Sequence, residues 1–140
     1  MDEYIRRLFD ELEDHVGDDW IEDYEEELIN ALETRTDKER FIEPIFALLE
    51  KYPLADWGIP GALAHFLESF DTETEERFLL NSLERQPTML TVFMLNRLIN
   101  TDGKPEYLAA MRGIAGNTAI ASEISASARD FVEFQKKKRQ

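Results

Sequence analysis

The side chains in this sequence that could do chemistry are mainly carboxylates, and they gather at its N-terminal end. The first 27 residues carry thirteen acidic side chains against two arginines, which gives a local charge of −11 within a total of −14. Paired carboxylates can act as general acid and base, but only where one of them is removed from water. Carboxylates crowded on the polar face of a helix stay hydrated, so we predict binding rather than catalysis at this end.

The other reactive residue types form no catalytic or metal-binding pattern. The two histidines, His15 and His65, have Leu12 and Ala62 three residues before them, so neither belongs to a Glu-x-x-His metal motif. The chain has no cysteine, and its six glycines do not form a phosphate-binding loop. We therefore predict a protein that is not an enzyme and that needs no cofactor and no metal ion.

The negative charge restricts the choice of partner. A field of one sign favours a basic partner and repels phosphate backbones, so we expect a basic protein and no nucleic acid. The N-terminal residues lack the pattern of a signal peptide, and no stretch reaches the roughly 18 apolar residues of a membrane span. We therefore expect a cytoplasmic protein without a membrane partner.

The elements that must position these side chains are helices. Apolar residues recur at helical spacing almost from end to end, without a convincing segment of period-two alternation. With 140 residues, of which 43% are hydrophobic, the chain is predicted to form one all-helical domain over 1–140, ending in a basic tail at 135–140. The expected helices cover about 4–16, 18–35, 37–52, 60–70, 72–86, 89–100 and 105–115, and a last one starts near Thr118.

Residue types also indicate which side chains face inward and where the helices begin. Tyr4 and Trp20 are expected to face the core, and Pro44 either kinks the third helix or marks a later start. Side chains that can cap a helix, and prolines that fit its first turn, predict the starting points. These residues are Asp37, Pro60, Thr72 with Glu75, Thr88 and Pro105.

Helices of this length joined by short turns are expected to lie antiparallel to their neighbours. Two short internal matches suggest repeated helix pairs, because 28–33 resembles 79–84, and 49–53 resembles 83–87, which lies 34 residues later. A period of this size is typical of helical-hairpin repeats. We therefore predict about eight short antiparallel helices in a HEAT-like right-handed stack of helical hairpins, with an irregular helix bundle as the alternative.

Four residues stand out against the apolar pattern around them. Asn96 and Arg97 interrupt the most apolar helix, and His65 interrupts an apolar stripe. A buried asparagine or arginine must find partners, so structural bracing is the favoured interpretation, and a groove that presents these residues to a ligand is the alternative. Trp57 lies in a loop rich in glycine and proline. It is interpreted as a plug between the third and fourth helices, or else as an interface anchor.

The segments WGIPGALAHFLE at 57–68, PT at 87–88 and TVFMLNRLIN at 91–100 carry a family resemblance. Together they resemble small, all-helical immunity proteins that accompany bacterial polymorphic toxins, including those of contact-dependent growth inhibition. The resemblance implies a cytoplasmic protein that binds one cognate toxin domain and blocks its activity, without a cofactor or turnover. The positions of the family's tryptophan, histidine and asparagine–arginine pair would correspond to Trp57, His65, Asn96 and Arg97.

The acidic second helix is not part of this resemblance, and its role is inferred from charge alone. Many toxin domains of this kind are nucleases with cationic clefts, which an acidic surface could fill. We therefore predict an immunity protein that neutralises a basic, nuclease-like toxin domain, with a non-inhibitory helical-repeat adaptor as the alternative function. A solvated helix face is the alternative for the acids themselves. The predicted contact residues on this helix are Asp18, Asp19, Glu22, Asp23, Glu25 and Glu26.

Overall fold

The computed structural model describes residues 1–58 and 61–138, and it confirms the all-helical prediction. No strand occurs in this part of the chain. A short 3₁₀ helix, η1 (Lys38–Phe41), precedes the third α-helix. The α-helices are α1 (Glu3–Asp14), α2 (Ile21–Glu33), α3 (Ile42–Lys51), α4 (Gly61–Glu68), α5 (Thr72–Arg85), α6 (Met89–Thr101), α7 (Pro105–Ala115) and α8 (Ser122–Lys138).

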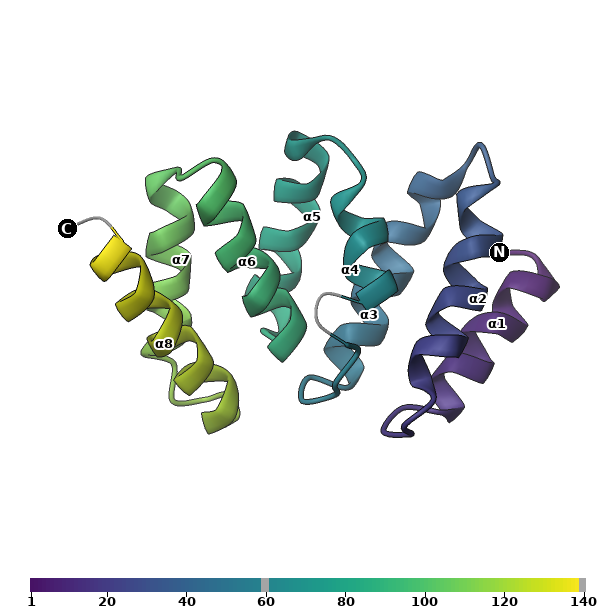
Figure 1. Cartoon of the computed structure of the whole chain (residues 1–140), viewed down its shortest axis with the longest axis horizontal. Coiled ribbons are helices and arrows are strands. Elements are labelled where there is room, and N and C mark those ends of the chain that lie inside the picture. Colours follow the sequence, from purple (N-terminus) through teal and green to yellow (C-terminus); the bar gives the residue numbers. More distant parts are fainter. Residues whose placement is uncertain (59–60, 139–140) are drawn as a thin grey trace.

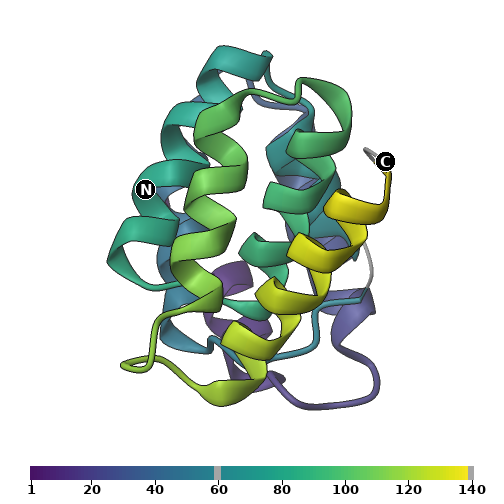
Figure 2. The ribbon, with the colours of Figure 1, turned by 90° about the vertical axis from the view of Figure 1, so that its left-hand side faces the viewer.

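The helices form antiparallel pairs that stand side by side in a row, with the two chain ends at opposite ends of the row (Figure 1). Helix α1 contacts α2, and α7 contacts α8. Between pairs, α2 contacts α4, α3 contacts α5, and α6 contacts α8. The odd-numbered helices therefore form one layer and the even-numbered helices the other, as the view along the row shows (Figure 2). This is a stack of helical hairpins, and its HEAT-like, right-handed form stays a prediction.

The layers decide which of the two internal sequence matches reflects a structural repeat. Residues 49–53 and 83–87 end α3 and α5, which are the first helices of adjacent pairs and lie in the same layer. The two segments also belong to connected loops, because the Met89 amide donates to the Pro53 carbonyl oxygen at 2.9 Å. The other match joins α2 to α5, which lie in opposite layers, so it does not mark equivalent positions.

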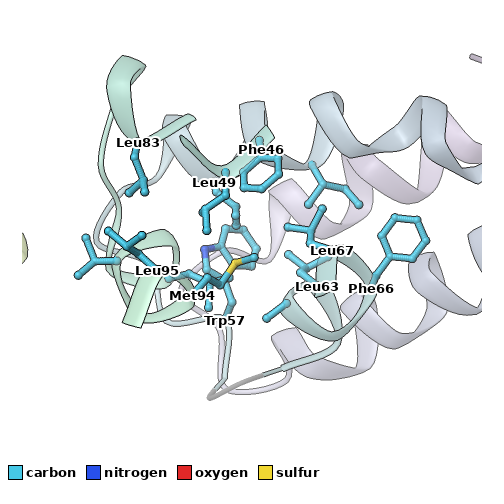
Figure 3. Packing of buried hydrophobic residues seen from close by; sticks show 14 of the residues in the cluster. Phe46, Leu49, Trp57, Leu63, Phe66, Leu67, Leu83, Met94 and Leu95 are labelled. Atoms are coloured by element: carbon cyan, nitrogen blue, oxygen red, sulfur yellow. The ribbon is translucent and has the colours of Figure 1, made fainter. Parts of the chain in front are cut away.

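An apolar core runs between the layers through the whole row. In its central part, Trp57 from the α3–α4 loop points into the same space as Leu49 of α3 and Met94 of α6 (Figure 3). The apolar stripes that the sequence places at helical spacing meet here. Burial of this area, at about 25 cal/mol for each Å² of apolar surface, is the main stabilising contribution to the fold.

Local capping signals predicted the start of α6 correctly. The hydroxyl of Thr88 accepts a hydrogen bond from the Thr91 amide at 3.0 Å, and the hydroxyl of Thr91 accepts one from the Thr88 amide at 3.0 Å. This reciprocal capping box satisfies two amides at the end of a helix whose surroundings are buried. Pro105 also opens α7 as predicted.

The predicted cap of α5 is wrong by one residue. The carboxylate of Asp71 accepts a hydrogen bond from the Thr74 amide at 2.8 Å, so Asp71 is the N-cap and Thr72 is the first helical residue. Asparagine and aspartate are at least as good at capping as threonine, and the shift needs no other cause. Helix α8 likewise begins at Ser122 rather than near Thr118.

The start of the third helix also differs from the prediction. Asp37 makes no capping hydrogen bond through its side chain, because its carboxylate accepts one from Arg35 Nε at 2.9 Å. The chain then forms η1 before α3 begins at Ile42. Pro44 therefore lies in the first turn of α3, where the missing amide costs nothing and no kink is needed.

Some predictions fall at the edges of the described part of the chain. Pro60, predicted to open α4, and Arg139 and Gln140 at the end of the predicted basic tail lie outside the described residues. The three lysines at 136–138 form the last turn of α8, where positive charge is favourable for the helix dipole. Within 1–58 and 61–138, no helix combines the length and the apolar character that a membrane crossing requires.

Candidate protein-binding surface

The predicted contact acids in and just before α2 differ in burial, because one faces the core and the others face solvent. Glu25 is fully buried, so in this structure its side chain does not reach the surface on which the contact was predicted. The reason is helical spacing, because Glu25 follows the buried Ile21 by four residues and precedes Leu28 by three. The same spacing, read from the sequence, could have placed Glu25 inside. The remaining acids of the set, Asp18, Asp19, Glu22, Asp23 and Glu26, are exposed.

The buried carboxyl group of Glu25 has no hydrogen-bond partner in the described part of the chain. Burial, with a smaller contribution from repulsion by the carboxylates of Glu22, Asp56 and Glu26, raises its pKa to about 8. The nearby backbone amide of Leu63, in α4, opposes this rise in pKa. Glu25 is therefore mainly neutral at pH 7 and does not add to the surface charge.

Most of the exposed acids in and just before α2 have no cationic partner among the described residues, unlike some acids elsewhere in the fold. Glu50, for example, binds Arg85 at 2.8 Å between α3 and α5. Asp18 contacts His15 at 2.8 Å. For Asp19, Glu22, Asp23 and Glu26, no described lysine or arginine nitrogen comes within 4.0 Å. We call Asp18, Asp19, Glu22, Asp23 and Glu26 the acidic surface.

A groove of about 480 Å³ lies between α2 and α4 and is lined by three of the predicted contact residues. Glu22 and Glu26 line its α2 wall, and His65, which is exposed, lines its α4 wall. Ile29 and Phe66 add apolar surface between them. Carboxylates above an apolar floor can bind the charged end of a lysine or arginine while its methylene groups cover the floor. This acidic groove is continuous with the acidic surface through Glu22 and Glu26.

Trp20, which was expected to be buried, is 73% exposed. It occupies the N-cap position of α2 with a non-helical backbone, so its side chain does not continue the inward stripe that begins at Ile21. Its sequence neighbours Asp18 and Asp19 are exposed acids. An exposed tryptophan beside charged residues is typical of a binding surface, and sequence reasoning missed it because the helix start was placed too early.

Trp57 is buried, with 2% of its surface exposed, which agrees with the interpretation as a plug. It fills space between α3, α4 and α6 in the core (Figure 3). The expectation that Trp57 contacts a partner directly through its ring is therefore not met in this structure. The loop that carries Trp57, residues 54–58, lines a surface groove.

Asn96 is also buried, and its partner comes from the last helix. Gln135 Nε2 donates to Asn96 Oδ1 and to Asn100 Oδ1, both at 2.9 Å. Lys138 Nζ donates to the same oxygen of Asn100 at 3.0 Å. These contacts join α6 to α8, so Asn96 braces the last hairpin rather than facing a partner.

Arg97 braces a different pair of elements. Its Nε donates to Oε2 of Glu68, at the end of α4, at 2.7 Å. The other oxygen of Glu68 is buried without a hydrogen-bond partner among the described residues. Burial raises the pKa of the nearby Glu75 to about 7, Glu68 adds to this rise, and Arg97 opposes it. Arg97 is thus paired with Glu68, and its positive charge also favours the ionised form of Glu75.

The predicted site residues therefore separate into an outer set and a bracing set. The outer set is the acidic surface with His65, the bracing set is Trp57, Asn96 and Arg97, and the buried Glu25 belongs to neither. Within 1–58 and 61–138, no group of three histidine, aspartate or glutamate side chains could hold a metal ion. In comparisons with known proteins, no protein-family model, no curated protein and no solved structure matches this chain.

Proposed function

We propose that this chain is an immunity protein that binds a basic toxin domain and neutralises it through the acidic surface of α2. The observation that carries this proposal is that Asp19, Glu22, Asp23 and Glu26 are exposed and have no described lysine or arginine nitrogen within 4.0 Å. Glu22 and Glu26 are four residues apart on one helix, where like charges destabilise it by a few tenths of a kcal/mol. A cationic partner would remove this repulsion.

The charge pattern suits the inhibition of a nuclease-like toxin. Such a toxin needs a cationic cleft for its phosphate substrate, and carboxylates on a rigid helix can occupy that cleft instead. Long-range attraction between the two surfaces would also accelerate their encounter. The exposed Trp20 extends the acidic surface with an apolar anchor of the kind that contributes most to protein–protein affinity.

Further support comes from the resemblance of 57–68 and 87–100 to immunity proteins of polymorphic toxins. Under this proposal the protein acts in the cytoplasm, as a binder rather than an enzyme, and uses no cofactor. Its partner is the cognate toxin domain, and neither nucleic acid nor a membrane is bound. Asn96, Arg97 and Trp57 would then stabilise the packing of the central and C-terminal helices instead of contacting the toxin.

A growth experiment tests the proposal with a matched control. The C-terminal domain of a large secreted protein encoded beside this chain would be expressed alone, with the wild-type chain, and with two variants. The test variant neutralises Asp19, Glu22, Asp23 and Glu26 as asparagine or glutamine. The control variant makes the same change of four charges in the C-terminal half of the row, at Glu84, Glu106, Glu123 and Asp130, which are exposed.

The two variants also match in helix-dipole effects, because each removes two first-turn acids. Glu22 and Asp23 lie in the first turn of α2, while Glu106 and Glu123 lie in the first turns of α7 and α8. We expect toxicity, rescue by the wild type and the control, and loss of rescue by the test variant. Binding measured by calorimetry should weaken steeply with salt for the wild type and less so for the test variant.

Two outcomes would overturn the proposal. Absence of rescue by the wild type, with stable binding to the same domain, would favour the alternative of a non-inhibitory adaptor. Equal rescue and equal salt dependence for the test and control variants would show that the acids of α2 are only a solvated helix face.

A further inference from the structure

A second groove, apolar in character, lies beside the acidic surface. It has a volume of about 310 Å³, and its walls are formed by the α3–α4 loop, α6 and α8. Asp56 is the one charged residue among those that line it. We call it the apolar groove, and its lining residues are Leu54, Ala55, Asp56, Trp57, Gly58, Met89, Leu90, Phe93, Ser127 and Phe131.

The walls of the apolar groove are large side chains that the fold leaves partly in water. Leu54 is 50% exposed, and the rings of Phe93 and Phe131, 6.5 Å apart, are half-buried. One turn further along α8, Phe134 is 49% exposed and extends this apolar face. Large apolar side chains gathered around a groove on one face mark a binding surface more often than scattered ones do.

The apolar groove and the acidic groove meet at one contact. Gly58 lines the apolar groove and Glu22 lines the acidic groove. A Cβ atom on Gly58 would lie 2.7 Å from Glu22 Oε1, and the backbone of Gly58 has a φ of +86°. The positive φ favours glycine at this position, and the short approach places the Glu22 carboxylate at the rim of the apolar groove. Asp56 stabilises the same rim, because its Oδ1 accepts a hydrogen bond from the Gly58 amide at 2.9 Å.

We infer that the apolar groove receives an aromatic side chain of the partner that is flanked by lysine or arginine. The aromatic ring would lie among Leu54, Phe93 and Phe131, and the flanking cations would pair with Asp56 and Glu22. Charge complementarity selects this occupant, because an apolar segment with acidic flanks would be repelled at the rim. The inference rests on the proposed function and specifies which segment of the basic partner binds.

A second copy of this chain is the competing occupant, because its own α8 carries Phe134 followed by three lysines at 136–138. That arrangement would give a dimer whose mass depends on protein concentration. The test below therefore includes a measurement of mass by light scattering at low and high concentration. We expect a monomer at both concentrations.

The probe is a five-residue peptide with a phenylalanine between two lysines, and the readout is the NMR shift of the 54–58 amides and the Trp57 indole. We expect saturable binding to the full chain. Replacing the phenylalanine with serine should weaken binding on the order of tenfold, which equals about 1.4 kcal/mol. Replacing both lysines with glutamate should abolish saturation.

Matched variants of the chain locate the contact. Leu54→Ser should weaken probe binding severalfold, whereas Tyr4→Ser, at a residue 52% exposed on α1, should not. Asp56→Asn keeps the oxygen that accepts the Gly58 amide and should also weaken binding, whereas Asp130→Asn on the exposed side of α8 should not. All four substitutions are at exposed positions, so the fold is retained.

The outcomes separate this inference from the proposed function. Equal binding of the phenylalanine and serine peptides, or equal effects of Leu54→Ser and Tyr4→Ser, would overturn the inference while leaving toxin rescue unaffected. Concentration-dependent dimerisation that Phe134→Ser abolishes would assign the groove to a second copy instead. Probe binding as expected, without toxin rescue, would overturn the immunity function and leave the chemistry of the groove in place.

Discussion

Arg97 of α6 donates from Nε to Oε2 of Glu68 of α4 over 2.7 Å, and this contact joins two hairpins of the row. The Glu68 side chain is largely buried and its second oxygen lacks a hydrogen-bond partner among the described residues. Glu75 adds a second carboxyl group, whose pKa rises to about 7 through burial and through Glu68. Arg97 therefore stabilises the fold by pairing with Glu68, and this role does not depend on a binding partner.

Replacing Arg97 with alanine is expected to lower the free energy of unfolding by about 1–3 kcal/mol, because it leaves a partly buried carboxylate unpaired. Urea unfolding at pH 7.5 measures this change. The control is Arg40→Ala, at an exposed arginine whose contact with Asp37 spans 3.7 Å, which should cost less than about 0.5 kcal/mol. Equal losses for the two variants would contradict the bracing role.

The buried Glu25 is expected to make stability depend on pH. Between its ordinary pKa of 4.5 and its raised pKa of about 8, the folded protein holds a proton that the unfolded chain has lost. The free energy of unfolding therefore falls as pH rises through this range, by up to about 1.4 kcal/mol per pH unit. Glu75 contributes in the same direction up to about pH 7.

Glu25→Gln removes the titrating group and is expected to flatten this dependence. The variant should be more stable than the wild type at pH 8, where the wild type must ionise a buried carboxyl group. Denaturant unfolding from pH 5 to pH 9 measures both slopes. Glu26→Gln, at the exposed neighbour, serves as the control and should keep the wild-type slope. Parallel curves for Glu25→Gln and the wild type would rule out this account.

The exposed Trp20 is expected to matter for binding and not for folding. Trp20→Ala should change the free energy of unfolding by no more than about 0.5 kcal/mol, because the side chain is 73% exposed. If Trp20 anchors the toxin domain, the same change should weaken binding by about 2 kcal/mol or more. Calorimetric titration measures the latter, with Tyr4→Ala as the exposed aromatic control. A stability loss above 2 kcal/mol would show that Trp20 is structural.

Trp57 is expected to show the opposite behaviour. Trp57→Ala should cost about 3–5 kcal/mol of stability, because it leaves a cavity among Leu49, Leu63 and Met94. Trp57→Phe fills part of the cavity and should cost less. Thermal unfolding followed by circular dichroism measures both. Retention of wild-type stability by Trp57→Ala would contradict its place at the centre of the core.

Much of the fold could be predicted because its signals are local. Helical spacing of Ile5, Leu8 and Leu12 defines the inward face of α1, and the hydroxyls of Thr88 and Thr91 define the start of α6. These interactions involve residues three or four positions apart, so the sequence alone carries them. The wrong predictions at Asp37 and Thr72 are also local, since each arises where two nearby polar side chains compete for the same cap or partner.

The candidate site could be predicted only in part, because its assembly depends on contacts between helices. The sequence by itself determined the all-helical class, the concentration of acidic residues in 1–27 and the exposed acids in and just before α2. The tertiary structure decided that Trp20 stays in water, and that Asn96 and Arg97 bind Gln135 and Glu68. It also placed Glu22 against Gly58, where the two grooves meet. Residues tens of positions apart become neighbours only when the hairpins stack. Local sequence patterns span a few residues and therefore do not predict these contacts.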